Sequence, residues 1–363
     1  MADIKKEIIE LAQQLIRFKS TKDNPQELKN CLDFVASYLK KFSVIKRFRF
    51  KNKPSLVAYY KNIKPKFFLV GHLDVVEAPN EQFKPTIKGN KLFGRGAADM
   101  KGGVAIMLAL FKELAKEQEK PPFGLMITTD EEIGGHNGTG ELVKRYKSKF
   151  VIVPEPNQSE KPGQLNITIK HKGVLWLKIK AKGKAAHSSM PWLGDNAIDK
   201  LILVYERIRE KFCEITPNTW NSTINLSVIS GGETPNKIPD YAEAIVDIRW
   251  IENFDKDKFL DSIKDLDAEF EIVEYSPMLD NDKNNKYIKL LQNCVRKQTG
   301  QNCLLLKMHG ATDAKFFSVK GIPAVVFGPF GKNYHALGEY LDLNTIVPTY
   351  NALKEFLLKC SKM

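Results

Sequence analysis

The chain has 363 residues, 43% of them apolar and 27% charged, and its 56 Lys and Arg against 43 Asp and Glu give a net charge of +13. This composition is that of a folded globular protein and excludes wholesale disorder, a collagen-like repeat and a coiled coil. The length favours two domains, and the basic charge raises nucleic acid or an acidic substrate as partners.

Helices and strands alternate over the first 155 residues. Apolar residues at helical spacing predict two helices before residue 40. A Gly-rich stretch over 94–103 then leads into a predicted helix from about Val104 to Glu117. The predicted strands are 55–60, 66–70, 124–129 and 151–153. This alternation predicts an α/β domain with a mostly parallel central sheet.

The pattern changes near residue 165. The segments 165–169 and 174–180 alternate apolar and polar residues, as half-exposed antiparallel strands do. An α+β unit follows, with predicted helices over 195–212 and 255–265 and strands over 222–229 and 242–250. The polar stretch 280–285 resembles a linker, and alternation then resumes to a buried strand over 324–327 and a final helix over 345–360. The second domain is therefore expected to be inserted into the first.

Neither a membrane span nor a signal segment is expected. No apolar run approaches the ~18 residues of a membrane helix, and the N-terminus lacks an apolar core. The cysteines are odd in number, scattered and without a C-x-x-C pair, which favours a reducing compartment over a disulfide framework or a thiolate zinc site. We expect a cytoplasmic protein with no membrane partner.

Most side chains that can do chemistry stand where predicted strands end or in the Gly-rich turn. They are His72, Asp74, Asp99, Asp130, Glu131, Glu132, Glu155 and His335. In open α/β sheets, ligands bind beyond the carboxyl ends of the strands. These residues are therefore expected to form one site.

Two histidines and three carboxylates together favour a bound cation, since crowded bare carboxylates repel one another. Imidazole ligands suit zinc, cobalt or manganese rather than calcium. Two metals fit if one carboxylate bridges them, roughly 3.5–4 Å apart, and a shared water then becomes hydroxide near neutral pH. Each residue alone has a plainer interpretation: His72 as a strand-end histidine, Asp99 as a helix N-cap, and 130–132 as a solvated turn.

Five motifs, in their order along the chain, resemble those of the acetylornithine deacetylase, succinyl-diaminopimelate desuccinylase and carboxypeptidase G family of di-zinc hydrolases. They are Gly71-His-Leu-Asp74, Gly94-Arg-Gly-Ala-Ala-Asp-Met-Lys-Gly-Gly103, Asp130-Glu-Glu132, Glu155 and His335. The resemblance covers nearly the whole chain. It implies a zinc-exopeptidase-like α/β catalytic domain interrupted by a ferredoxin-like α+β lid that dimerises. The expected limits are 1–170 and 279–363 for the catalytic domain and 171–278 for the lid.

The resemblance also implies metal roles. His72 and Glu155 would complete one metal site, Glu132 and His335 the other, and Asp99 would bridge both. Two divalent metals are expected, Zn²⁺ first, with Co²⁺ or Mn²⁺ as alternatives.

Two carboxylates around the metals take other roles in this resemblance. Asp74 would hydrogen-bond the His72 ring and fix its tautomer. Glu131 would be the general base, which takes a proton from the bridging water and delivers it to the leaving amine. The peptide bond between Asp99 and Met100 is expected to be cis.

The lid carries further matches. His187, in Lys184-Ala-Ala-His-Ser-Ser-Met-Pro191, would stabilise the oxyanion in the partner subunit's active site. Asn236 and Arg249 would grip the substrate's carboxylate, a task that suits the guanidinium fork. Gly310 would face the substrate with its backbone. His136, His171 and His309 have no assigned role; His136 and His171 are expected at the surface and His309 in a structural role.

The substrate expected is an N-acyl-L-amino acid with a free carboxylate, hydrolysed at its amide. Asp313-Ala-Lys-Phe-Phe317 resembles desuccinylases and peptidases more than acetylornithine deacetylases. Desuccinylases usually carry an Arg pair where this chain has His171-Lys172, which weakens that assignment. Succinyl-diaminopimelate leads, and acetylornithine or a short peptide is the alternative.

Two other functions are possible in principle, a nucleic-acid-binding protein and a catalytically inactive scaffold. The stretch 40–53 alternates basic and aromatic residues, which suits stacking on single-stranded nucleic acid, although a solvated strand with its apolar face inside explains it better. A catalytically dead relative that serves as a scaffold would have lost a ligand or the base, and none is lost. We therefore expect no nucleic-acid partner.

Overall fold

The computed structural model describes residues 2–156, 161–213 and 219–363. The chain forms two compact units. The first contains Met1–Lys170, Leu279–Met308 and Thr312–Met363, and the second contains His171–Met278 with His309–Ala311.

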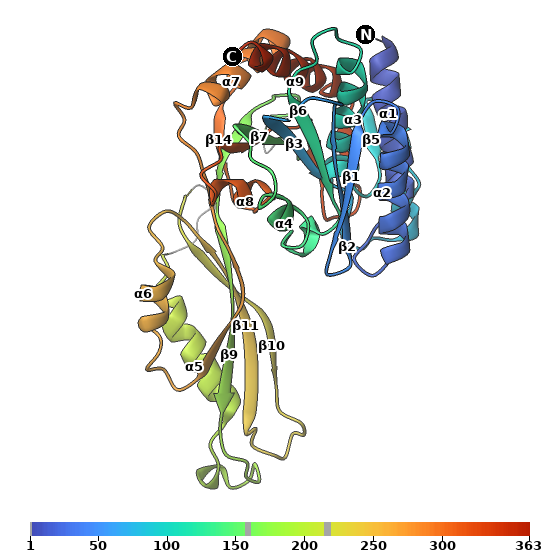
Figure 1. The fold of residues 1–363 in the computed structure, drawn as a ribbon. Coiled ribbons are helices and arrows are strands. Elements are labelled where there is room, and N and C mark those ends of the chain that lie inside the picture. The colour runs from blue at the N-terminus through green and yellow to red at the C-terminus, as the bar shows by residue number, and fades with distance from the viewer. Residues whose placement is uncertain (1, 157–160, 214–218) are drawn as a thin grey trace. The chain divides into compact units, whose positions relative to one another are not determined.

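A nine-stranded sheet runs through the first unit (Figure 1). Its strands, in spatial order, are β1 (Val44–Phe50), β2 (Lys53–Tyr59), β6 (Phe123–Thr128), β3 (Phe67–His72), β7 (Phe150–Val153), β15 (Ala324–Val326), β8 (Ile167–His171) and β13 (Leu279–Asp280), with β14 (Leu305–Met308) paired to β8. The four central strands β6, β3, β7 and β15 are parallel. β3, β6 and β7 are buried along their whole length, as strands covered on both faces should be. The predicted mainly parallel sheet is confirmed.

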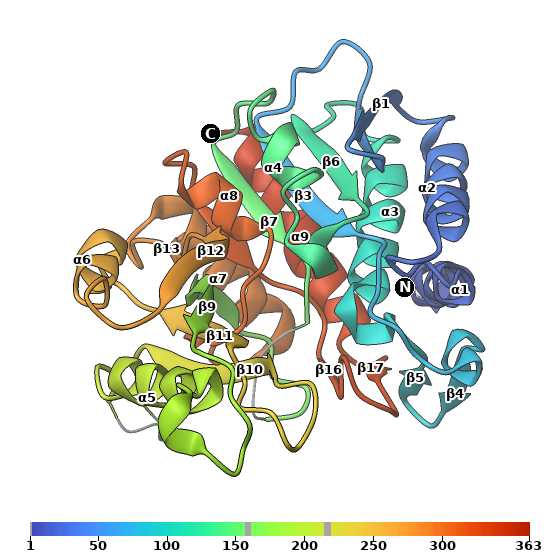
Figure 2. The same ribbon diagram turned by 90° about the horizontal axis from the view of Figure 1, so that it is seen from below.

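Helices cover this sheet. They are α1 (Ala2–Arg17), α2 (Pro25–Leu39), α3 (Gly102–Leu114), α4 (Thr139–Leu142), α7 (Lys286–Thr299), α8 (Ala314–Ser318) and α9 (Ile346–Ser361). α3 contacts α1 and α9, and α9 contacts α7 (Figures 1 and 2). Local residues set the helix ends: Asn24 caps α2 by accepting from the Glu27 amide at 3.3 Å, directly before Pro25. α7 ends at Gly300, which adopts the left-handed conformation that glycine tolerates.

A small sheet in the first unit consists of β16 (Gly331–Lys332), β17 (Tyr340–Asp342), β5 (Lys91–Phe93) and β4 (Thr86–Lys88). Short helical turns occupy Asn80–Phe83, Ala97–Lys101 and Glu131–Ile133. β5 precedes the turn that carries Asp99, and the β16–β17 connection carries His335. This sheet therefore ties together two segments of the candidate site that are far apart in sequence.

The second unit is an antiparallel sheet with helices. Its strands, in order, are β10 (Thr223–Gly231), β11 (Tyr241–Trp250), β9 (Gly173–Lys182) and β12 (Glu269–Ser276), and its helices are α5 (Ala197–Arg209), α6 (Lys256–Asp261) and the turn Pro191–Leu193. Every second residue of β11 is buried, and residues such as Leu177 and Val246 form a core with Leu201 of α5. The predicted α+β character and alternation are confirmed.

Three sequence-based expectations are wrong. The segment 165–169 is buried rather than half-exposed, because β8 joins the central sheet beside β15. The stretch 280–285 is more than a linker: its first residue ends β13, and the Asn281 amide donates to Ile169 O at 2.9 Å and Ala324 O at 2.6 Å. His171 is fully buried rather than at the surface, since it ends that same strand β8.

Within the described residues, every helix is too short or too polar to span the apolar core of a bilayer. All five cysteines are free thiols, and only Cys213 is exposed.

Candidate metal centre

Three neighbouring parallel strands deliver most of the candidate site. β6, β3 and β7 lie side by side in the same direction, so their carboxyl ends meet at one edge. His72 is the last residue of β3, Glu131 and Glu132 occupy the turn after β6, and Glu155 follows β7 by two residues. This arrangement agrees with the expectation that these residues gather at one edge of the sheet.

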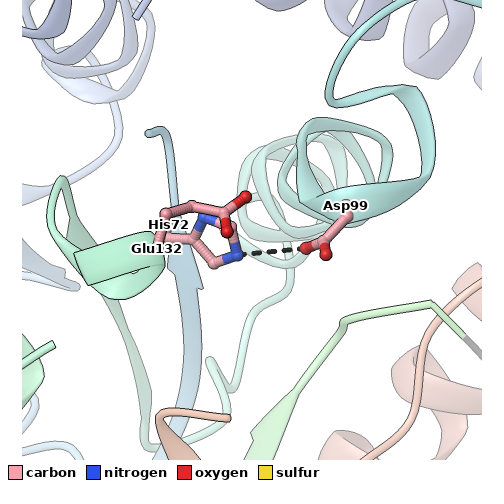
Figure 3. Close-up of side chains that lie close together, drawn as sticks. All are labelled: His72, Asp99 and Glu132. Carbon is pink, nitrogen blue, oxygen red and sulfur yellow. Dashed lines mark ion pairs between the residues drawn. The ribbon is translucent and has the colours of Figure 1, made fainter. Parts of the chain in front are cut away.

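Asp99 faces both histidines with a different oxygen for each. Its Oδ1 lies 3.2 Å from His72 Nε2, and its Oδ2 lies 3.4 Å from His335 Nε2. His335 Nε2 is also 3.1 Å from Glu132 Oε2. Ligand atoms of His72, Asp99 and Glu132 all lie within 4.8 Å of one another (Figure 3). One carboxylate thus stands between two imidazole rings, as a bridging ligand requires.

The His72 ring is oriented through its other nitrogen. Nδ1 lies 3.0 Å from the backbone oxygen of Asp74, an acceptor, so Nδ1 carries a proton, and in the neutral ring Nε2 then holds the lone pair. The expected partner, the Asp74 carboxylate, is farther away at 3.6 Å. Asp74 Oδ2 instead accepts a hydrogen bond from the Glu132 amide at 2.9 Å. Asp74 therefore orients two of the candidate ligands, one with its main chain and one with its side chain.

The donor set fits a divalent metal. Within the described part of the chain, buried Glu155 Oε1 makes no hydrogen bond, and buried His72 Nε2 has only its 3.2 Å approach to Asp99. A buried polar atom without a partner costs roughly 1–3 kcal/mol, and coordination to a cation would satisfy both. Imidazole with carboxylate is a ligand combination that zinc, cobalt and manganese accept.

The electrostatics of the cluster lead to the same conclusion. Burial raises the pKa of Glu131 and of Glu155 well above the usual range, and neighbouring carboxylates add to this. Burial alone would lower the pKa of His72, but Asp99, Asp74 and Glu131 raise it well above its ordinary value. The carboxylates of Asp99 and Glu132 raise the pKa of His335 to about 10. Without a cation the cluster binds protons to balance its charge, and a metal would displace them.

Glu339 holds the Asp99 turn and was not predicted from the sequence. Its Oε1 accepts from the amides of Ala98 and Asp99 at 2.9 and 3.0 Å. Its Oε2 accepts from Arg95 Nη1 at 2.7 Å and from the Gly96 amide at 3.0 Å. Glu339 is 1% exposed, so all four contacts are shielded from water. The available signal was an acidic residue four positions after His335.

A second buried carboxylate supports the turn after β6. Asp130 Oδ2 accepts from the amides of Asn137 and Gly138 at 2.9 and 3.0 Å. Burial, with Asp313 and Asp74 nearby, raises the pKa of Asp130 to about 7. Of the Asp-Glu-Glu run, the first residue therefore shapes the turn while the other two face the cluster.

The remaining candidate residues belong to the second unit. The loop of His187 pairs with that of Asn236, since the Ser188 amide donates to Asn236 O at 3.1 Å and His187 bridges to Lys237. Arg249 lies in β11 and grips Asp247 through Nε and Nη2, both at 2.8 Å. Gly310 is exposed, as is His309 before it. The fold of the second unit thus brings the loops of His187 and Asn236 together.

Two structural predictions about histidines and the backbone are tested. The Asp99–Met100 peptide bond is cis, as predicted. His136 is exposed, as expected. The His309 ring lies 5.8 Å from the indole of Trp220, whose Nε1 donates to Glu252 at 2.9 Å.

Comparisons with known proteins agree with this geometry. The sequence profile of peptidase family M20/M25/M40 matches residues 68–359. A protein of Staphylococcus aureus (strain MSSA476), named probable succinyl-diaminopimelate desuccinylase, is 28% identical over 98% of both chains. The structure of the M20 family metallo-carboxypeptidase Sso-CP2 from Sulfolobus solfataricus superimposes with a TM-score of 0.83 at 19% identity, over 98% of this chain and 100% of that one. Bacillus subtilis YXEP, described as a dinuclear metal binding peptidase, gives 0.69 at 15% identity, over 100% and 99%.

Proposed function

The chain belongs to peptidase family M20/M25/M40 and is a hydrolase, and on that premise we propose that it cleaves the amide bond of an N-acyl-L-amino acid with a free carboxylate. The observation that carries the proposal is the convergence of His72 and His335 on the two oxygens of Asp99, with Glu132 beside His335. Succinyl-diaminopimelate is the leading substrate, and acetylornithine or a short peptide is the alternative.

We assign His72 and Glu155 to one metal and Glu132 and His335 to a second, with Asp99 between them. The separate oxygens that Asp99 offers to the two histidines support a bridging role. Zn²⁺ is the expected metal, with Co²⁺ or Mn²⁺ as substitutes. When bound, such a pair polarises the amide carbonyl and lowers the pKa of water.

Glu131 is the proposed general base. Its carboxylate lies 3.9 Å from His72 Nε2 and is 13% exposed, so it borders the cluster and remains accessible to water. Burial raises its pKa, which suits a group that must hold a proton and then release it. We propose that it accepts the proton of the attacking water and passes it to the leaving amine.

The second unit is the proposed lid, and it holds two basic side chains close enough to interact, Arg249 and Lys172. Arg249 is held by Asp247 through Nε and Nη2, a pairing that does not use Nη1. Lys172 is only 2% exposed, with its ammonium 5.7 Å from the centre of the Trp220 ring. Burial, and then Arg249, lower the pKa of Lys172. We propose that Arg249 and Asn236 bind the α-carboxylate and that Lys172 favours an acyl group with its own negative charge.

His187 is proposed to act across a homodimer, where it would stabilise the oxyanion of the partner's site. It lies in an exposed loop, and its Nδ1 is 2.7 Å from Ser189 Oγ, which leaves Nε2 free of that contact. Large apolar side chains are exposed on α5 and on the edge strand β10. They are Ile202, Leu203, Val228 and Ile229. A second copy of the lid would cover them. We propose the cytoplasm as the compartment because the five cysteines are free.

The deciding experiment is a substrate panel with the Zn²⁺- or Co²⁺-loaded protein. It compares succinyl-diaminopimelate, acetylornithine, other acetyl-amino acids and dipeptides by kcat/KM, each beside its carboxamide, which lacks the free carboxylate. Glu131→Gln should retain both metals and lose about 10²–10⁴-fold in turnover. Lys172→Met should lower kcat/KM for the succinyl substrate more than for the acetyl one. Equal hydrolysis of acids and carboxamides, or full activity of Glu131→Gln, would contradict the proposal.

A further inference from the structure

A cavity remote in sequence from the metal-ligand segments lies between α2 and the β1–β2 hairpin of the first unit. Its volume is about 560 Å³, within the range of sites for small molecules. Leu28 and Leu32 of α2, each 2% exposed, and Pro54 of β2 provide apolar lining. No candidate metal ligand lines this cavity.

The lining is basic. Lys29, Arg47, Arg49 and Lys53 belong to it, and none of the described residues that line it is a carboxylate. Asp33 of α2 pairs with Lys29 at 2.7 Å and also with Arg47, so these two charges are partly balanced. Arg49 and Lys53 form no ion pair with any residue that the structure describes. The cavity therefore combines an apolar surface with uncompensated positive charge.

The alternation of β1 separates this charge from the aromatic residues of the same stretch. Successive side chains of a strand point to opposite faces, so Arg47 and Arg49 lie on one face and Phe48 and Phe50 on the other, although Phe48 also belongs to the cavity lining. The two phenylalanine rings stack at 6.1 Å, and the Arg145 guanidinium lies 5.9 and 5.1 Å from their centres. Rings covered in this way do not offer bases a stacking platform, which disfavours nucleic acid as the occupant.

We propose that this cavity is a binding site for a small organic anion that joins one carboxylate to an aliphatic body. The carboxylate would pair with Arg49, whose planar guanidinium offers two parallel hydrogen bonds. The aliphatic body would contact the apolar part of the lining, to which Leu28, Leu32 and Pro54 belong. The site is independent of the hydrolytic reaction proposed above, so each idea can fail without the other.

The test uses the full chain with octanoate as probe, acetate as a probe of charge alone, and oligothymidylate as a nucleic-acid probe. Isothermal titration gives Kd, and methyl NMR of labelled leucines locates the ligand. Arg49→Glu should weaken octanoate binding by about 10- to 100-fold. Lys46→Glu is the matched control, because Lys46 is exposed on the same strand but points to the face of Phe48. It makes the same change of charge and should alter Kd by less than about twofold.

The expected result is that octanoate shifts the methyl signals of Leu28 and Leu32, binds more tightly than acetate, and loses affinity in Arg49→Glu alone. Equal weakening in both variants would show a general charge effect and overturn the proposal. So would acetate binding as tight as octanoate, or octanoate binding without shifts of the two leucines. Oligothymidylate binding that Arg49→Glu abolishes would replace the small anion by single-stranded nucleic acid.

Discussion

Replacing Glu339 by glutamine tests whether this buried carboxylate positions the proposed bridging ligand. Each oxygen of Glu339 accepts two hydrogen bonds from the turn that contains Asp99. A glutamine has nearly the same shape but only one oxygen. In either orientation its NH₂ group therefore faces two donors that have lost their acceptor.

The expected loss of stability follows from the number of donors left unpaired. Each buried donor left unpaired costs roughly 1–3 kcal/mol, so two of them give about 2–6 kcal/mol of lost stability. If the amide takes the place of Oε2, the buried Arg95 guanidinium also loses its charged partner at 2.7 Å, which favours the upper part of this range. Because the Asp99 amide is one of the four donors, the turn should also lose its exact position. Metal affinity should then fall by about 10- to 100-fold, as for other residues that orient metal ligands.

Urea unfolding and isothermal titration with Zn²⁺ or Mn²⁺ measure the two effects separately. Glu7→Gln is the matched control, since Glu7 accepts from Lys112 at 2.7 Å and Tyr38 at 2.6 Å and contacts none of the proposed ligands. It should lose stability and keep metal affinity. If Glu339→Gln loses stability like the control but binds metal as the wild type does, Glu339 is only structural and the reasoning is refuted.

Three further predictions concern His335, Glu355 and Leu203. First, metal binding at pH 8 should release at least one proton per chain. The reason is that Asp99 and Glu132 raise the pKa of His335 to about 10, whereas a ligating imidazole must be neutral. Calorimetric titration in two buffers of different ionisation enthalpy measures the proton release, and a binding enthalpy that is the same in both buffers would contradict it. Second, Lys359, Lys297 and Gln298 lower the pKa of Glu355 from 4.5 to about 2, so its stabilisation is present above pH 4.5 and is lost as the pH falls toward 2. Glu355→Gln should therefore cost about 1–3 kcal/mol in urea unfolding at pH 7, and this cost should shrink below pH 4.5; a pH-independent difference would exclude the ion pairs as its cause. Third, Leu203 is 67% exposed on α5, and Leu203→Glu should convert the proposed dimer to a monomer while the fold is retained. Light scattering measures the mass, and a dimer that persists would place the interface elsewhere.

Much of the fold was predictable because it depends on local periodicity. The helical spacing before residue 40 corresponds to α1 and α2, and the short apolar run before His72 corresponds to β3. The predicted boundaries differ by a few residues, as for α3, which ends at Leu114 rather than at Glu117. β12 was missed because its alternating Glu and apolar residues lie in a strongly charged segment.

The sequence by itself determined the chemistry of the candidate site. His72, Glu131, Glu132 and Glu155 follow directly from strands, and the parallel order of those strands brings strand ends together whatever the surrounding detail. The family motifs likewise depend only on residue identity and order.

Only the tertiary structure decided how that site is held. Glu339 and Asp99 are 240 positions apart, and no local pattern encodes a hydrogen bond between them. The burial of β8 depends on its place in the central sheet beside β15, a strand more than 150 residues later. The alternation of basic and aromatic residues in β1 does not show that α2 packs beside the face of Arg47 and Arg49; only the tertiary structure does. Residue types set which groups can bind a cation, whereas long-range packing sets which of them are held in position to do so.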